Sequence, residues 1–169
     1  MVKYLAILIL FASCALYGFQ SAKALERRAA MHKKLCSAIR TISNVVLTTR
    51  QPLFSIMQKY PEIPFRRLIL ACFEGLPGGE DAAAVFERAE REQGAELGGA
   101  IDAETRQVLT EFLLALRQLD GSRLSEAMKR AETDMEKIAE RTESDSRQRG
   151  RIYRTVGVLL GAAVAILLI

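Results

Sequence analysis

Very few side chains in this chain have a type and spacing that could carry out chemistry. The single histidine, His32, lies in a basic stretch without the His-Glu-x-x-His spacing of a zinc site. The three cysteines, Cys14, Cys36 and Cys72, are widely spaced and odd in number, which indicates neither a disulfide framework nor a metal site. No Gly-rich loop followed by Lys-Ser or Lys-Thr is present to hold a nucleotide phosphate. We therefore expect no enzymatic activity, no cofactor and no small-molecule substrate.

Charge is distributed unevenly between the body of the chain and its ends. The net charge is +4 overall, but between Leu35 and Ser146 there are 14 basic and 19 acidic residues, a net charge of −5. An acidic body argues against nucleic acid as a partner, because nucleic acid requires a basic surface. The basic surplus near the ends suits anionic lipid headgroups, at about 1 kcal/mol per cation. The predicted basic collar consists of Lys23, Arg27, Arg28, Arg147, Arg149, Arg151 and Arg154.

Both ends of the chain are apolar and predict contact with a lipid bilayer. Tyr4–Ala22 carries no charge, and as a helix it would cover about 28 Å, close to the ~30 Å hydrocarbon core. Thr155–Ile169 would cover only about 22 Å, which fits a short span or a deep insertion. The predicted division is therefore a membrane helix over 1–22, an acidic helical body over 23–154 and a short membrane helix over 155–169. The basic residues lie on the inner side of both apolar segments, which places the body in the cytoplasm.

Two processed forms of the N-terminal segment remain open. Ala22-Lys23-Ala24 has the small-x-small form of a signal-peptide cleavage site. Cys14, preceded by Phe11-Ala12-Ser13, could end a lipoprotein signal, although Phe11 fits that pattern poorly. Either cleavage would make the chain an exported or lipid-anchored helical binding module.

Apolar periodicity and Gly/Pro breaks predict an all-α fold, a helical bundle whose long first and last helices pair antiparallel. The expected helices cover Gln20–Thr49 (continuing from the apolar end), Pro52–Tyr60, Phe65–Leu76, Ala82–Gln93, Ala103–Leu119 and the chain after Gly121. The inward stripe of the first helix is expected to be Leu35, Ile39, Ile42 and Val46. The last helix carries a coiled-coil seam of Leu124, Met128, Ala131, Met135 and Ile138.

Small residues recur every four positions near the C-terminus. Gly157, Gly161 and Ala165 form an edge that lets a second helix approach closely, and the first apolar segment offers Gly18 and Cys14 as a matching edge. A separate acidic pair, Glu80 and Asp81, is expected to cap the helix that follows, with a partner-binding surface as the second interpretation.

These features together resemble the stage III sporulation protein AB family, which is itself similar to the F-type platform proteins of type II secretion. The most specific part is the tail Ile152-Tyr153-Arg154-Thr155-Val156-Gly157-Val158-Leu159-Leu160-Gly161, which leads to an Ile-Leu-Leu-Ile terminus. The apolar run that closes on Gly18-Phe19, Pro52-Leu53 at the second helix and the Ala-rich Asp81–Ala89 also match. The chain departs from the family at Val45-Val46, Arg117 and Leu124, where interface contacts could differ.

The resemblance implies a membrane subunit of the secretion-like channel complex between mother cell and forespore. Its implied partners are a cytoplasmic secretion-type ATPase and the other membrane subunits of the complex, and its implied place is the mother-cell membrane. Assembly of several copies into a homo-oligomer stays open. The implied mechanism is mechanical coupling of the motor to the membrane apparatus.

Overall fold

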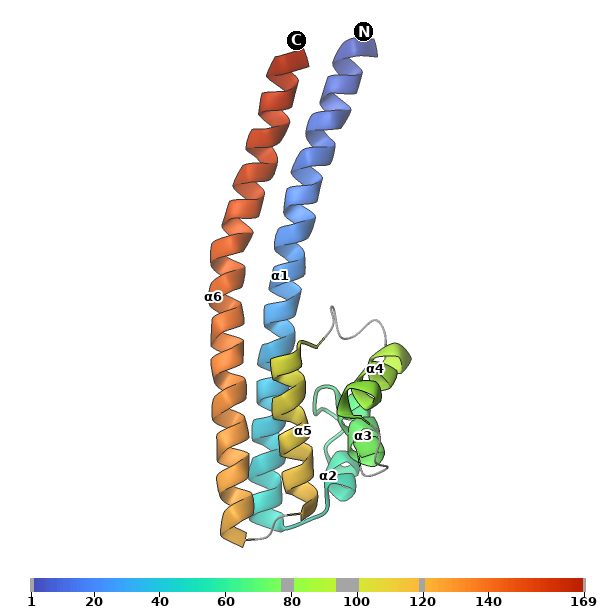
Figure 1. The fold of residues 1–169 in the computed structure, drawn as a ribbon, viewed down its shortest axis with the longest axis vertical. Coiled ribbons are helices and arrows are strands. Elements are labelled where there is room, and N and C mark those ends of the chain that lie inside the picture. The colour runs from blue at the N-terminus through green and yellow to red at the C-terminus, as the bar shows by residue number, and fades with distance from the viewer. Residues whose placement is uncertain (1, 77–80, 94–100, 119–120, 169) are drawn as a thin grey trace. The chain divides into compact units, whose positions relative to one another are not determined.

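The computed structural model describes residues 2–76, 81–93, 101–118 and 121–168. In these residues the chain forms helices and turns without any β-strand, so the all-α prediction is confirmed (Figure 1). The helices are α1 (Val2–Thr49), α2 (Leu53–Lys59), α3 (Arg66–Gly75), α4 (Ala82–Gln93), α5 (Ala103–Gln118) and α6 (Gly121–Leu168). The chain divides into two compact units: unit 1 comprises Met1–Ala30 and Arg141–Ile169, and unit 2 comprises Met31–Glu140.

The helices begin at residues whose side chains or backbones suit a helix start. Asp81 accepts a hydrogen bond from the Ala83 N–H (3.2 Å), and Asp102 accepts one from the Thr105 N–H (2.8 Å), so both act as N-caps of α4 and α5. The cap expected from the pair Glu80 and Asp81 is therefore confirmed at Asp81. α6 starts at Gly121 with φ +60°, a left-handed conformation that only glycine adopts without steric cost.

Two turns of unit 2 use left-handed residues that are not glycine. Arg50, directly after α1, has φ 53°, and Phe65, directly before α3, has φ 56°. Such a residue costs about 1–2 kcal/mol in backbone energy. At Arg50 the turn is held by a hydrogen bond from its N–H to the Val46 carbonyl (2.8 Å). The sequence did not predict these conformations, because neither residue type favours them.

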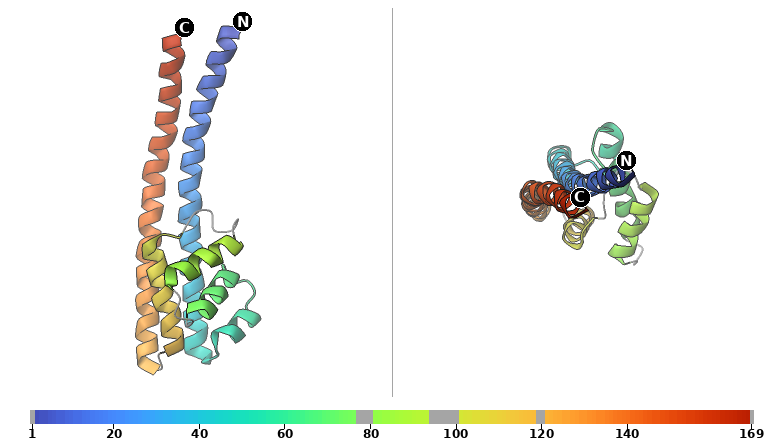
Figure 2. Two further views of the ribbon diagram at one scale, coloured as in Figure 1. Left: turned by 45° about the vertical axis from the view of Figure 1, so that its right-hand side comes forward. Right: turned by 90° about the horizontal axis from the view of Figure 1, so that it is seen from above.

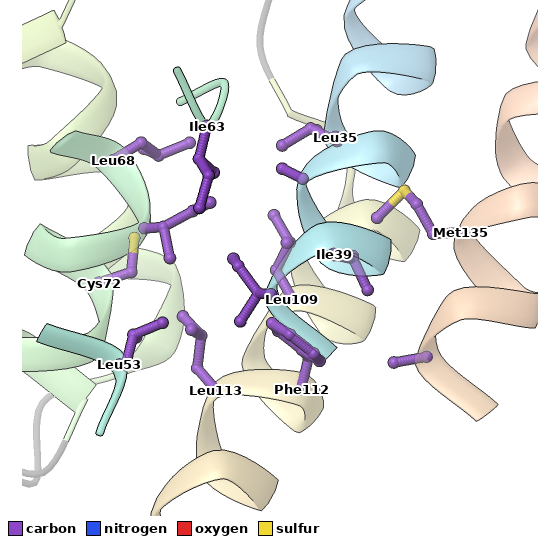
Figure 3. Close-up of a cluster of buried hydrophobic side chains, with 14 of the residues drawn as sticks. Leu35, Ile39, Leu53, Ile63, Leu68, Cys72, Leu109, Phe112, Leu113 and Met135 are labelled. Carbon is purple, nitrogen blue, oxygen red and sulfur yellow. The ribbon is translucent and has the colours of Figure 1, made fainter. Parts of the chain in front are cut away.

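Unit 2 is built around one continuous apolar core. The stripe of α1 is completely buried from Leu35 to Ile42, and Met128 and Met135 of α6 have no exposed surface. In Figure 3 the side chains of α5 lie between those of α1 and those of the α2–α3 region, and Met135 of α6 lies beside α1. The core contains two fully enclosed phenylalanines, Phe86 of α4 and Phe112 of α5, each 1% exposed. Both predicted stripes are confirmed, with Leu124 only partly buried against this core.

Unit 1 is a pair of antiparallel helical segments, the N-terminal part of α1 and the C-terminal part of α6. The two segments run side by side in both side views (Figures 1 and 2). The facing pairs show the antiparallel order. Phe11 of α1 faces Gly161 of α6, Gly18 faces Gly157, and Ala22 faces Gly150. Within the residues that the structure describes, neither helix contains a stretch that is long and apolar enough to cross a membrane.

Candidate functional site

Glycines line a close contact between α1 and α6 in unit 1. A methyl group on Gly18 would lie 2.6 Å from the carbonyl oxygen of Tyr153 and 3.1 Å from the Cα of Gly157. A methyl group on Gly157 would lie 3.0 Å from the carbonyl oxygen of Cys14. Because these neighbours are backbone atoms, the two helices could accept a side chain here only by moving apart.

The small-residue edge continues one turn further along α6. Gly161 is buried against Phe11, with the Cδ2 atom of that ring 2.9 Å from the position of an added methyl group. Ala165 is half-buried. The structure thus brings Gly157 together with Gly18 and Cys14, whereas Gly161 meets an aromatic side chain rather than a small residue.

The outer surface of unit 1 is strongly apolar. In the described part of the chain, fourteen large apolar side chains are exposed, and twelve of them belong to unit 1. Tyr17 is 74% exposed, Leu159 62% and Ile166 75%. In water each Å² of exposed apolar surface costs about 25 cal/mol, so this number of exposed apolar side chains indicates an interaction surface.

The predicted basic collar is partly neutralised by carboxylates of unit 1. Arg147 pairs with Glu143 at 2.6 Å and Arg149 pairs with Asp145 at 3.7 Å, both across one turn of α6. Arg154 of α6 forms an ion pair and a hydrogen bond with Glu26 of α1. The Arg154–Glu26 pair could not be predicted from the sequence, because its partners are 128 residues apart.

Three other collar residues are not part of an ion pair of this kind in the described chain. Lys23, Arg27 and Arg151 are exposed, and among the residues that the structure describes they form no ion pair. Arg28 is engaged in another interaction of the fold. The collar is therefore divided into cations that balance nearby carboxylates and cations that face solvent unbalanced.

His32 is buried in unit 2 and takes part in a polar contact inside the bundle. Its Nε2 lies 3.2 Å from Thr105 Oγ1, and both residues have no exposed surface. Thr105 is in the first turn of α5, where its N–H is bound by Asp102. A buried contact between a histidine and a threonine orients two helices and leaves no access for a substrate. Thr105 was not singled out from the sequence, because a lone threonine in a helix gives no signal.

The two cysteines of unit 2 lie in different surroundings. Cys72 is completely buried in the core. Burial raises the pKa of the half-buried Cys36 thiol; Arg40 acts to lower it, and the carboxylates of Glu136 and Glu132 add to the rise. A thiol whose pKa is raised is a poor nucleophile at neutral pH. Among the described residues, no group of three or more His, Cys, Asp or Glu side chains could hold a metal ion.

Of the predicted acidic edge, Glu80 lies outside the described residues. Asp81 is exposed, and one of its oxygens caps α4.

Comparison with known proteins bears on the whole chain. Residues 3–169 match the family described as stage III sporulation protein AB. Searches of the curated proteins and of the solved structures gave no match. The family match includes both ends of the chain, where the glycine contact of α1 and α6 lies. The chain therefore belongs to the stage III sporulation protein AB family.

Proposed function

We propose that this protein is a non-enzymatic membrane subunit of a secretion-like complex between mother cell and forespore. In this proposal unit 1 lies in the mother-cell membrane and unit 2 is cytoplasmic, where it transmits the movement of a secretion-type ATPase to the membrane subunits. The observation that carries the proposal is the family match over residues 3–169, which makes this a sporulation protein from end to end.

The surface of unit 1 supports the membrane part of the proposal. Its glycine contact packs two helices closely, with the ring of Phe11 against Gly161, and twelve other large apolar side chains among the described residues of unit 1 remain exposed. In a bilayer such an exterior is favourable, since lipid tails replace water around it. The run Tyr4–Ala22 carries no charge in the sequence. The structure does not describe the side chains at positions 4–6 and 8, so the length of this apolar run is known from the sequence alone.

Unit 2 supports the coupling part of the proposal. It has its own apolar core, and its charged surface carries exposed ion pairs such as Arg40–Glu136 between α1 and α6 (3.1 Å). The sequence has no phosphate-binding loop, so the chemical energy would come from a separate motor. A compact bundle that is continuous in sequence with the apolar ends suits mechanical coupling.

Membrane sidedness tests the proposal directly. Ser125→Cys places a thiol at an exposed position of α6 in unit 2, in a full-length chain whose Cys14, Cys36 and Cys72 are replaced by serine. Cells that express this variant are treated with a membrane-impermeant thiol reagent before and after permeabilisation. We expect the introduced thiol to be protected in intact cells and labelled after permeabilisation. We also expect the chain to remain in the membrane pellet after alkaline extraction.

Labelling in intact cells would overturn the coupling proposal and favour the exported binding module. Mass measurement of the chain from the same cells provides the control, since cleavage at Ala24 or Cys14 removes Met1. Co-purification of the chain with the secretion-type ATPase from sporulating cells tests the partner, and its absence from mild-detergent extracts would contradict direct coupling.

A further inference from the structure

Six of the seven residues of the basic collar fall into two sets of three, and the seventh, Arg28, is engaged in another interaction of the fold. The balanced set is Arg147, Arg149 and Arg154, each held by a carboxylate of the same unit. The unbalanced set is Lys23, Arg27 and Arg151, which are exposed and form no ion pair among the described residues. The positive charge of the unbalanced set is not offset by a paired carboxylate of the described chain, and its members can turn all of their hydrogen-bond donors to a ligand.

The unbalanced cations lie close to one another in the fold. Ala22 and Gly150 face each other, with 3.8 Å between the Ala22 Cβ and the position of a Cβ on Gly150. Lys23 and Arg151 directly follow these two residues, so they flank the same helix contact. Arg27 lies one turn of α1 beyond Lys23 and on the same face, because side chains four apart in a helix are neighbours.

The same cations adjoin the apolar exterior of unit 1. Ile152 and Tyr153, directly after Arg151, are 54% and 45% exposed, and Phe19, one turn before Lys23, is 52% exposed. A cluster of free cations at the edge of an exposed apolar surface matches the boundary of a bilayer, where phosphate groups lie next to hydrocarbon.

We infer that Lys23, Arg27 and Arg151 form a binding site for the headgroups of anionic phospholipids, while the paired arginines do not take part. This inference rests on the proposed membrane location of unit 1 and adds to it a preference for lipid charge. Guanidinium groups bind phosphate oxygens in a forked geometry and the ammonium of Lys23 binds them as a point charge. An acidic protein surface is the competing occupant, but it would leave the adjacent apolar exterior unexplained.

The test measures which lipids the full-length protein retains. The protein is equilibrated in mixed micelles of a neutral detergent, phosphatidylcholine and phosphatidylglycerol, and the lipids that co-purify are quantified by mass spectrometry. We expect phosphatidylglycerol to be enriched, and the triple variant Lys23→Gln, Arg27→Gln, Arg151→Gln to lose that enrichment by up to about fivefold per cation removed. The enrichment of the wild type should fall as salt is added.

A matched control removes whole ion pairs and leaves the net charge unchanged. Glu143→Gln with Arg147→Gln, and Asp145→Asn with Arg149→Gln, should retain the wild-type enrichment. Loss of enrichment in this control, or its retention in the triple variant, would overturn the inference. Loss of a co-purifying protein from the triple variant with lipid enrichment unchanged would also overturn it and identify a protein partner. Carbonate extraction of the same variants measures membrane anchoring separately. Loss of the wild-type chain from the membrane would contradict the proposed function, whereas unchanged anchoring without lipid enrichment would contradict only the inference.

Discussion

Cys36 is the residue at which burial and nearby charge act together on one ionisable group. The loss of solvent raises the pKa of its thiol above the usual range, Arg40 opposes this rise, and Glu136 and Glu132 add to it. The folded state therefore holds the thiol proton more tightly than the unfolded chain does. The contribution of this group to stability is present below the ordinary thiol pKa and is lost as pH rises through the raised pKa.

We predict that Cys36 reacts slowly with thiol reagents near neutral pH and that its rate rises at higher pH than that of an exposed thiol. The reference is Ser125→Cys in a chain without the three native cysteines, and Cys36 is measured with Cys14 and Cys72 replaced by serine. Glu132→Gln should raise the rate of Cys36 modification by no more than about fivefold. This factor corresponds to the ~1 kcal/mol by which two close charges interact in water. Equal pH profiles for the two thiols would contradict the prediction.

Gly18 and Gly150 provide a matched test of the contact between α1 and α6. Gly18→Ala places a methyl group 2.6 Å from a backbone oxygen, so it should destabilise unit 1 by about 1–3 kcal/mol. Gly150→Ala places one at 3.8 Å, an ordinary contact, and should stabilise the helix by about 0.5–1 kcal/mol. Thermal unfolding of the full chain in detergent, followed by circular dichroism, measures both. A similar midpoint for the two variants would argue against the glycine contact.

At the scale of whole elements, the pairing of α1 with α6 can be trapped covalently. The 3.8 Å between the Ala22 Cβ and the Cβ position of Gly150 equals the usual separation in a disulfide. In a chain without native cysteines, Ala22→Cys with Gly150→Cys should form an intramolecular disulfide under mild oxidation. The product is detected as a faster-migrating band in non-reducing electrophoresis. Tyr17→Cys with Gly150→Cys is the control that should remain reduced, since Tyr17 points outward with 74% exposure.

Within unit 2, Arg117 joins the end of α5 to the end of α3. Its Nη1 donates to the carbonyl oxygen of Phe73 at 2.9 Å, and its guanidinium lies 5.1 Å from the centre of the Phe73 ring. Arg117→Ala should lower stability by about 1–2 kcal/mol, since the α3 carbonyl loses its charged donor. Arg130→Ala, which breaks only an exposed pair with Glu126, should cost no more than about 0.5 kcal/mol. Urea unfolding measures the free energy of unfolding of both variants. Equal losses of stability would show that the Arg117 contact is weak.

At the scale of the whole molecule, unit 2 depends on one core whereas unit 1 depends on one helix contact. Phe112→Ala should destabilise unit 2 by about 3–5 kcal/mol, because it removes a buried ring from the core and leaves a cavity. Phe54→Ala removes a ring that is 54% exposed and should change stability by about 0.5 kcal/mol or less. The rate of modification of the buried Cys72 reports opening of unit 2. A rate unchanged by Phe112→Ala would contradict this account of the core.

Much of the fold could be predicted from the sequence because its signals are local. Gly121 starts α6, Asp81 and Asp102 cap α4 and α5, and the stripe from Leu35 to Val46 marks the buried face of α1. Each of these features depends on residues within a few positions of one another. The same local rules gave helix ends within one or two residues of those in the structure.

The candidate site was only half predictable. The spacing of Gly157 and Gly161 pointed to a close helix contact, and the basic residues of the collar could be counted. The sequence could not show that Phe11 rather than a small residue meets Gly161, or that His32 contacts Thr105. Such pairs join residues far apart along the chain, so only the folded arrangement selects them.

By itself, the sequence determined that this protein is all-α, that its body is acidic with apolar ends, and that it carries no known catalytic motif. These properties follow from composition and periodicity, which any arrangement of the helices would preserve. The tertiary structure decided which charges are balanced: Glu26 holds Arg154, whereas Lys23, Arg27 and Arg151 remain unpaired among the described residues. That decision depends on the register of two antiparallel helices, because a cation is neutralised only by a carboxylate within a few ångströms.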